Sequence, residues 1–251
     1  MTDVMTWQGV REPPGSPEYQ KIKESSMRAY KAVYKGGTGE IVEKKSRFIA
    51  HVANASTVEE AQEFIDKIKK EYWDARHNCS AFLVGDRNPV TRSSDDGEPG
   101  GTAGKPILEV IRGSGIRNIV IVVTRYFGGT LLGTGGLVRA YTDAAREGIL
   151  HSVIMEKIPG IRIRLVTDYT DLGKIQYLLA QNGIHTTDSE YSDQVVFSLL
   201  FPLEEKDRLC KVFTEATSGR VRIDEGEEVY FGEAEGKVIV FDEQQCGSPE
   251  G

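Results

Sequence analysis

A group of arginine, tyrosine and glycine residues follows a short apolar run at residues 119–123. The run I-V-I-V-V is rich in β-branched side chains, which predicts a buried strand. Arg125 and Tyr126 stand at its end, and a helix-like segment begins after the glycines. The glycines are Gly128, Gly129, Gly133, Gly135 and Gly136. A strand, a glycine loop and a helix start are typical of anion sites, because free N–H groups and the positive end of the helix dipole meet there.

Basic residues around the loop extend this prediction to phosphate. Between residues 104 and 146, six basic residues stand against two acids, which predicts a locally positive surface. We expect Arg125, Arg139 and the amides of residues 133–136 to converge on a phosphate of RNA or a nucleotide, with Lys105 as a further contact. The alternative is that the glycines permit tight turns while the arginines are solvated or paired. Neither G-x-x-x-x-G-K-[ST] nor a clean G-x-G-x-x-G is present, so these two phosphate loops are not expected.

Three acidic residues in the S-D-D-G-E turn are candidate metal ligands. Asp95, Asp96 and Glu98 carry the hard oxygen ligands that Mg²⁺ prefers. Adjacent acids in such a turn also cap backbone N–H groups, which needs no metal. Both interpretations are kept as hypotheses.

His77 and Cys79 stand two residues apart in a strand-like segment, so they would share one face. A thiol beside a base is a conceivable nucleophile pair. A strand cysteine flanked by Ala81 and Phe82 is more typical of buried packing.

The elements that would position these residues alternate between strands and helices. Residues 29–55 predict two antiparallel strands joined through glycines. Ser56 and Thr57 begin a helix with two overlapping capping-box registers. Pro106 suits the first turn of a short helix, and the helix after the glycine loop should end near Leu150.

The pattern of elements starts again after Pro159. The order strand, helix, strand, strand, helix, strand predicts a ferredoxin-like βαββαβ arrangement. From Asp224 onward nine acidic residues stand against one lysine, which predicts a solvated acidic tail. The expected parts are a flexible lead-in (1–25), a first domain (26–155), a ferredoxin-like domain (156–232) and an acidic tail (233–251).

Composition is that of a globular protein from a reducing compartment. The chain has 251 residues and a formal net charge of −7, so it has no overall attraction to nucleic acid or anionic lipid. Its three cysteines are widely spaced, and neither a disulfide framework nor a metal knuckle is expected. The sequence shows no signal peptide and no apolar stretch of about twenty residues, so we expect a cytoplasmic protein without a membrane span.

Two long motifs resemble a known family. The segments S-D-D-G-E-P-G-G-T-A-G-K-P-I-L and T-R-Y-F-G-G-T-L-L-G-T-G-G-L-V-R-A-Y, with A-R-H-N-C-S-A-F upstream, are similar to the bacterial YigZ members of the IMPACT family. The resemblance covers residues 30–150, and the βαββαβ unit is similar to the second domain of these members. It implies an α+β fold of two domains. The first would be a β-α-β domain shared with domain IV of elongation factor G and the GHMP kinases, and the second a ferredoxin-like domain comparable to domain V of that factor.

The resemblance implies contact with RNA or the ribosome, by analogy with the elongation factor. In eukaryotic relatives the family implies regulation of translation through a ribosome-associated coactivator of the amino-acid starvation kinase. An RWD-type domain is not evident here, so that partner is not carried over. The family supplies no established catalytic set, and the motif residues that map here are candidates for a functional surface only: Asp95, Asp96, Glu98, Arg125, Tyr126, Gly128 and Gly129.

Two functions from different classes follow. The first is a non-enzymatic, translation-associated factor that binds RNA or the ribosome through the basic glycine-loop face and uses no cofactor. The second is a metal-assisted enzyme for a phosphorylated small molecule or nucleotide, with Asp95, Asp96 or Glu98 holding the metal. The acidic tail leaves a protein-binding adaptor open, and the sequence indicates no oligomeric state.

Overall fold

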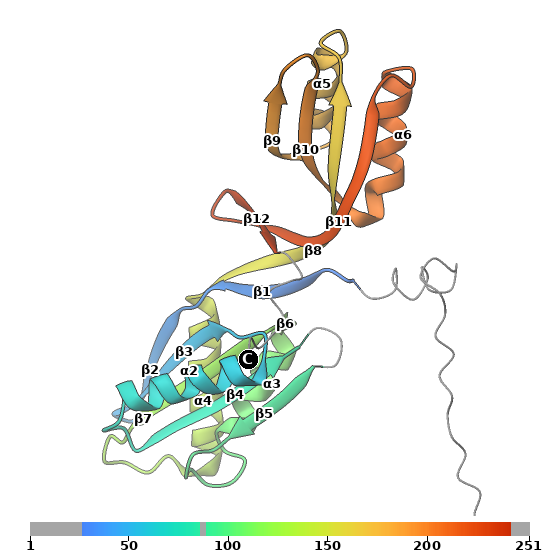
Figure 1. Cartoon of the computed structure of the whole chain (residues 1–251). Helices are drawn as coiled ribbons and strands as arrows, with labels where there is room; N and C mark the ends of the chain where they lie inside the picture. The colour runs from blue at the N-terminus through green and yellow to red at the C-terminus, as the bar shows by residue number, and fades with distance from the viewer. Residues whose placement is uncertain (1–26, 86–88, 242–251) are drawn as a thin grey trace, which may run out of the picture.

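The structure is a computed structural model that describes residues 27–85 and 89–241 (Figure 1). It consists of two mixed α+β domains, and one long strand, β8 (Val153–Thr167), runs from the first into the second. The strands form one sheet of five and one of seven. The expected two-domain α+β fold is confirmed.

The first domain is built on an antiparallel sheet whose centre is the predicted apolar strand. β7 (Ile119–Tyr126) pairs with β3 (Ser46–Asn54) on one side and β4 (His77–Val84) on the other. The edges are β2 (Thr38–Glu43) beside β3 and β5 (Val90–Ser94) beside β4. β7 is buried along almost its whole length, which explains its apolar, β-branched sequence.

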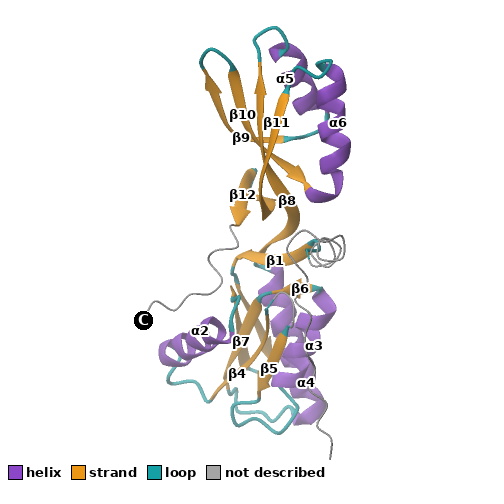
Figure 2. Ribbon diagram, turned by 45° about the vertical axis from the view of Figure 1, so that its right-hand side comes forward, coloured by secondary structure: helices purple, strands orange, loops and turns teal. Residues whose placement is uncertain are grey.

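Helices cover both faces of this sheet, as Figure 2 shows. α2 (Val58–Glu71) packs against one set of alternate β7 side chains. α3 (Gly104–Ser114) and α4 (Gly133–Leu150) cover the opposite set. Thr57 caps α2 by accepting the N–H of Glu60 at 3.1 Å. The second of the two predicted capping registers is therefore the one that forms.

α3 and α4 run in the same direction. α3 is followed by the short strand β6 (Ile116–Arg117) and α4 by β8, and both of these strands pair with β1 (Tyr30–Lys35). The carboxyl ends of the two helices therefore lie beside β1, and their amino ends lie together at the far end of the domain. We call that end the tip. It holds the two motif loops, 95–103 and 127–132, which precede α3 and α4.

The prediction of two strands over residues 29–55 is wrong, because three strands form there. β1 leaves the five-stranded sheet and pairs with β6 and β8 instead. The hairpin is β2–β3, and its turn is at Lys44 and Lys45, whose φ angles are 46° and 68°. Two positive φ angles are typical of a tight hairpin turn, so lysines occupy a place where glycines were expected.

The second domain has the predicted ferredoxin-like order, which is confirmed. Its elements after β8 are α5 (Leu172–Gln181), β9 (His185–Tyr191), β10 (Val195–Pro202), the 3₁₀ turn η1 (Leu203–Glu205), α6 (Lys206–Ala216) and β11 (Arg222–Ala234). The sheet order is β9-β10-β8-β11, and all neighbours are antiparallel. α5 and α6 pack on one face of this sheet (Figure 2).

Two predicted boundaries fall inside regular structure. β8 pairs first with β1 and then with β10 and β11, so residue 156 lies within a continuous strand. β11 extends to Ala234, and β12 (Lys237–Phe241) pairs with it, so the first part of the predicted tail is a hairpin. The predicted lead-in 1–25 and residues 242–251 lie outside the described residues. Within the described residues, no helix combines the length and apolar character needed to cross a bilayer.

Candidate functional site

Arg125 is buried and joins the two sequence motifs. Its Nη1 forms a salt bridge with Oε1 of Glu98, 27 residues away in the chain. Arg125 is 6% exposed, and its guanidinium lies over the rings of Phe48 and Phe127 at 5.3 and 5.7 Å. A buried charge needs a partner, and Glu98 is that partner. This geometry contradicts the expected phosphate contact, and the paired-arginine alternative holds for Arg125.

Tyr141 and Cys79 complete the buried cluster around Glu98. The Tyr141 hydroxyl donates to Oε1 of Glu98 at 2.9 Å, and Sγ of Cys79 lies 3.0 Å from the carbonyl oxygen of Asp95. Burial raises the pKa of the Cys79 thiol to about 12 and also raises the pKa of Tyr141. A thiol that stays protonated is a poor nucleophile. Cys79 therefore has a packing role and does not form a nucleophile pair with His77.

Asp95 caps α3. Its carboxylate accepts the backbone N–H groups of Gly101, Ala103 and Gly104 at 2.8, 3.0 and 2.8 Å. Burial by itself would raise the pKa of Asp95, but the three hydrogen bonds outweigh it and hold the pKa below its usual value. The capping interpretation of the acidic turn is confirmed for this residue.

Asp96 and Glu98 face other partners. Asp96 accepts from Nζ of Lys69 and from the N–H of Asn78, both at 2.7 Å, while Glu98 binds Arg125. Among residues 27–85 and 89–241, no three His, Cys, Asp or Glu side chains are placed to hold a metal together. The magnesium hypothesis gains no support from this arrangement, because each carboxylate already has donors from the protein.

The glycine loop serves close packing and backbone conformation. The N–H of Gly128 donates to Oγ of Ser46 at 3.0 Å, and a Cβ on Gly128 would meet the carbonyl carbon of Lys45 at 2.0 Å. Gly129 and Gly133 have φ angles of 86° and 72°, which other residues rarely adopt. These three glycines therefore have the geometric role that the alternative interpretation assigned to them.

Among the described residues, no side chain caps the amino end of α4. Leu132 is its N-cap residue and makes no side-chain hydrogen bond, whereas Asp95 caps the neighbouring α3. Gly133 and Gly135 are exposed, and Gly136 is half-buried. The first-turn N–H groups of an uncapped helix, together with its dipole, favour an anion.

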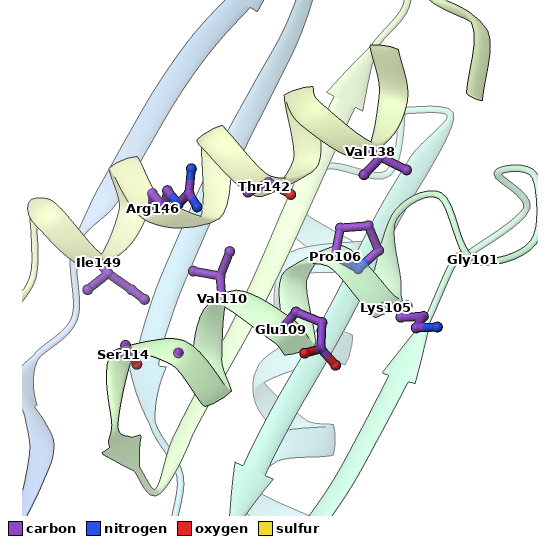
Figure 3. Close-up of a pocket in the computed structure, with 11 residues that line it drawn as sticks. Gly101, Lys105, Pro106, Glu109, Val110, Ser114, Val138, Thr142, Arg146 and Ile149 are labelled. Atoms are coloured by element: carbon purple, nitrogen blue, oxygen red, sulfur yellow. The ribbon is translucent and has the colours of Figure 1, made fainter. Parts of the chain in front are cut away.

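The other predicted contacts lie on different elements. Lys105, the second residue of α3, is exposed at the edge of a groove between α3 and α4 (Figure 3). Arg139 is exposed on α4, in the second turn and past the N–H groups with which it was expected to converge. Tyr126 is half-buried, and its hydroxyl donates to Oδ1 of Asp74 at 2.8 Å. The guanidinium of Arg47 lies 5.8 Å from the Tyr126 ring centre.

Sequence reasoning missed the exposed side chains that surround the loop. Trp73 is 81% exposed and Leu131 is 83% exposed. The turn of Lys44 and Lys45 packs directly against Gly128. A Lys-Lys pair is not a typical hairpin-turn sequence, so turn chemistry did not point to this turn. We use the name tip surface for Lys44, Lys45, Trp73, Phe127, Leu131 and residues 133–136.

Comparisons with known proteins agree with the two domains. Residues 44–149 match the model of the Impact N-terminal domain, and residues 165–220 match a domain of unknown function, DUF1949. The chain is 42% identical over 208 residues to IMPACT family member YvyE of Bacillus subtilis. The aligned region covers 83% of this chain and 96% of that protein. It is 41% identical over 161 residues to IMPACT family member YigZ of Escherichia coli. This alignment covers 63% of this chain and 79% of that protein.

A solved structure shares the fold. It is a crystal structure described as that of a hypothetical protein, with 34% identity and a TM-score of 0.52, and the match covers 78% of this chain and 97% of that one. The similarity to YvyE extends over almost the whole of that relative. The chain therefore belongs to the IMPACT family, in the form that carries two domains.

Proposed function

We propose that this chain is a translation-associated factor that binds structured RNA, ribosomal RNA in particular, through the tip surface and without catalysis. The uncapped amino end of α4 carries the proposal. α3 and α4 both direct their positive ends toward the tip, but Asp95 occupies only the end of α3. The first-turn N–H groups of residues 133–135, which have no intrahelical acceptor, would bind a phosphate oxygen of the RNA backbone.

Two lysines at the tip, beside the start of the glycine loop, support the same proposal. Lys44 and Lys45 are exposed in the turn that packs against Gly128. The chain as a whole has a net charge of −7 and would repel RNA. A local positive surface would therefore orient RNA toward the tip. Phosphate contacts from lysines and backbone amides give affinity that depends strongly on salt.

Exposed rings at the tip suit unpaired bases. Trp73 is largely exposed and Phe127 is about half exposed. An unstacked base on an aromatic ring contributes about 1–3 kcal/mol, and RNA loops offer such bases. The tip surface therefore combines phosphate donors with stacking platforms.

Arg125 supports this surface from inside. Its salt bridge to Glu98 connects the 95–103 loop with β7, and its guanidinium lies against the Phe127 ring. In the proposal Arg125 is a positioning residue that holds Phe127 and the loop after it. It takes no part in phosphate binding, because it is buried.

The family resemblance connects the proposal with translation. The resemblance to the IMPACT family implies domains comparable to domains IV and V of elongation factor G, and these imply ribosome contact by analogy. This analogy favours ribosomal RNA over an RNA of another class.

Co-sedimentation with ribosomes at low and high salt tests the proposal. The wild-type chain should pellet with ribosomes at low salt and leave them at high salt. The Lys44→Ala/Lys45→Ala variant should bind more weakly, with a salt slope smaller by about one to two units. Lys211→Ala/Lys237→Ala, which removes two exposed lysines of the second domain, is the matched control. Unchanged affinity and slope in the tip variant would refute the proposal.

A further inference from the structure

A groove of about 690 Å³ runs between the outer sides of α3 and α4 (Figure 3). Its apolar lining comes from Pro106 and Val110 of α3 and from Val138 and Ile149 of α4. Val138 is 37% exposed, although it lies in a helix whose other face is packed on the sheet. On α4 the groove is lined by Val138 and Ile149, with Thr142 and Arg146 between them. Val110 and Ile149 also pack against the core, so Val138 is the apolar side chain of this lining that is most available to a ligand.

The charged side chains that line the groove are two cations, Lys105 and Arg146, and one acid, Glu109. Glu109 pairs with Arg112, and Lys105 forms no salt bridge with another described residue. Two acids on these helices already have cations beside them, Glu109 with Arg112 at 2.9 Å and Asp143 with Arg146 at 3.5 Å. Both pairs are well exposed, so they are weak and easily exchanged. An incoming carboxylate would meet cations toward both ends of the groove.

We propose that this groove binds an acidic amphipathic helix of a partner protein. Apolar side chains at helical spacing would fill the space above Val110 and Val138, and acidic side chains on the flanks would face Lys105 and Arg146. Two parallel helices offer the ridges on which a third helix packs. An RNA backbone would gain nothing from the apolar lining, so the groove favours protein over RNA.

Peptide selection with the full chain tests this inference. A phage-displayed library of random peptides of about 16 residues, long enough for about four helical turns, is selected against the wild-type protein. The enriched peptides should be net acidic, with apolar residues three and four apart. Binding to Lys105→Glu/Arg146→Glu should be about tenfold weaker. Lys211→Glu/Lys237→Glu carries the same change of net charge on the second domain and should bind the peptides normally.

A second pair of variants tests the apolar lining. Val138→Glu should lose peptide binding, whereas Val42→Glu, at an exposed valine on β2, should keep it. Lys44→Ala/Lys45→Ala should also keep peptide binding, which separates this inference from the proposed RNA function. Enrichment of basic peptides, or of none, overturns the inference, as does equal binding by Lys105→Glu/Arg146→Glu. So does an RNA hairpin that shifts the amide NMR signals of Val110 and Thr142 as strongly as those of the tip.

Discussion

Removal of the Glu98 charge tests the central ion pair of the first domain. In Glu98→Gln the side chain keeps its shape and its hydrogen bond from Tyr141, but Arg125 loses its counter-charge. The Glu98 and Arg125 side chains are 3% and 7% exposed, so water cannot replace the lost carboxylate. Nε of Arg125 already has no hydrogen-bond partner among the described residues. Breaking a buried pair from one side costs about 3–5 kcal/mol, because a desolvated charge is left alone.

Urea denaturation followed by circular dichroism measures this loss. Glu98→Gln should reduce the unfolding free energy of the first domain by about 3 kcal/mol or more, which corresponds to a fall in Tm of roughly 10 °C or more. The matched control is Glu109→Gln, at an exposed pair with Arg112, and it should change stability by less than about 0.5 kcal/mol.

A double-mutant cycle separates the pair from other effects. Arg125→Met removes the buried cation, so Glu98→Gln/Arg125→Met should be less destabilised than the sum of the single variants by about 1 kcal/mol or more. A loss below about 1 kcal/mol in Glu98→Gln, or additive costs in the cycle, would show that the two motifs are not held together by this charge pair.

Gly128→Ala should lose about 1–3 kcal/mol of stability, because the new Cβ meets the backbone of Lys45. Gly135→Ala, whose Cβ meets nothing within 4 Å, should gain about 0.5–1 kcal/mol; similar changes in both urea midpoints would contradict the packing argument. Asp95→Asn should lose about 1 kcal/mol near neutral pH, measured by urea denaturation. Because the pKa of Asp95 is lowered on folding, its contribution is present above the unfolded pKa of about 4 and is lost as pH falls through the folded pKa. The stabilities of wild type and Asp95→Asn should thus converge in acid, and a gap that stays constant with pH would count against the cap. Cys79, whose pKa burial raises to about 12, should resist a thiol-specific disulfide reagent at about pH 8 until urea unfolds the domain; rapid labelling of the native protein would argue against its burial.

The order of elements was largely predictable because it rests on local patterns. The apolar run at residues 119–123 became β7, and the segment after the glycines became α4. The βαββαβ order of the second domain also follows from local periodicity and turn residues. Local patterns could not predict that β1 pairs with β6 and β8, or where β8 begins. Both depend on pairing between segments far apart in the chain.

The candidate site shows the same division. The sequence by itself shows the glycines and the acidic turn of the tip. From these residue types we could predict an anion site and a capping role as alternatives. Only the tertiary structure decided between them. It brings Glu98 to Arg125, 27 residues away, and Asp95 to the start of α3. It also places no capping side chain from residues 27–85 or 89–241 at the start of α4. The same arginine or carboxylate can bind a ligand or pair with another group of the protein. Which of the two it does depends on the groups that the fold places within hydrogen-bonding distance.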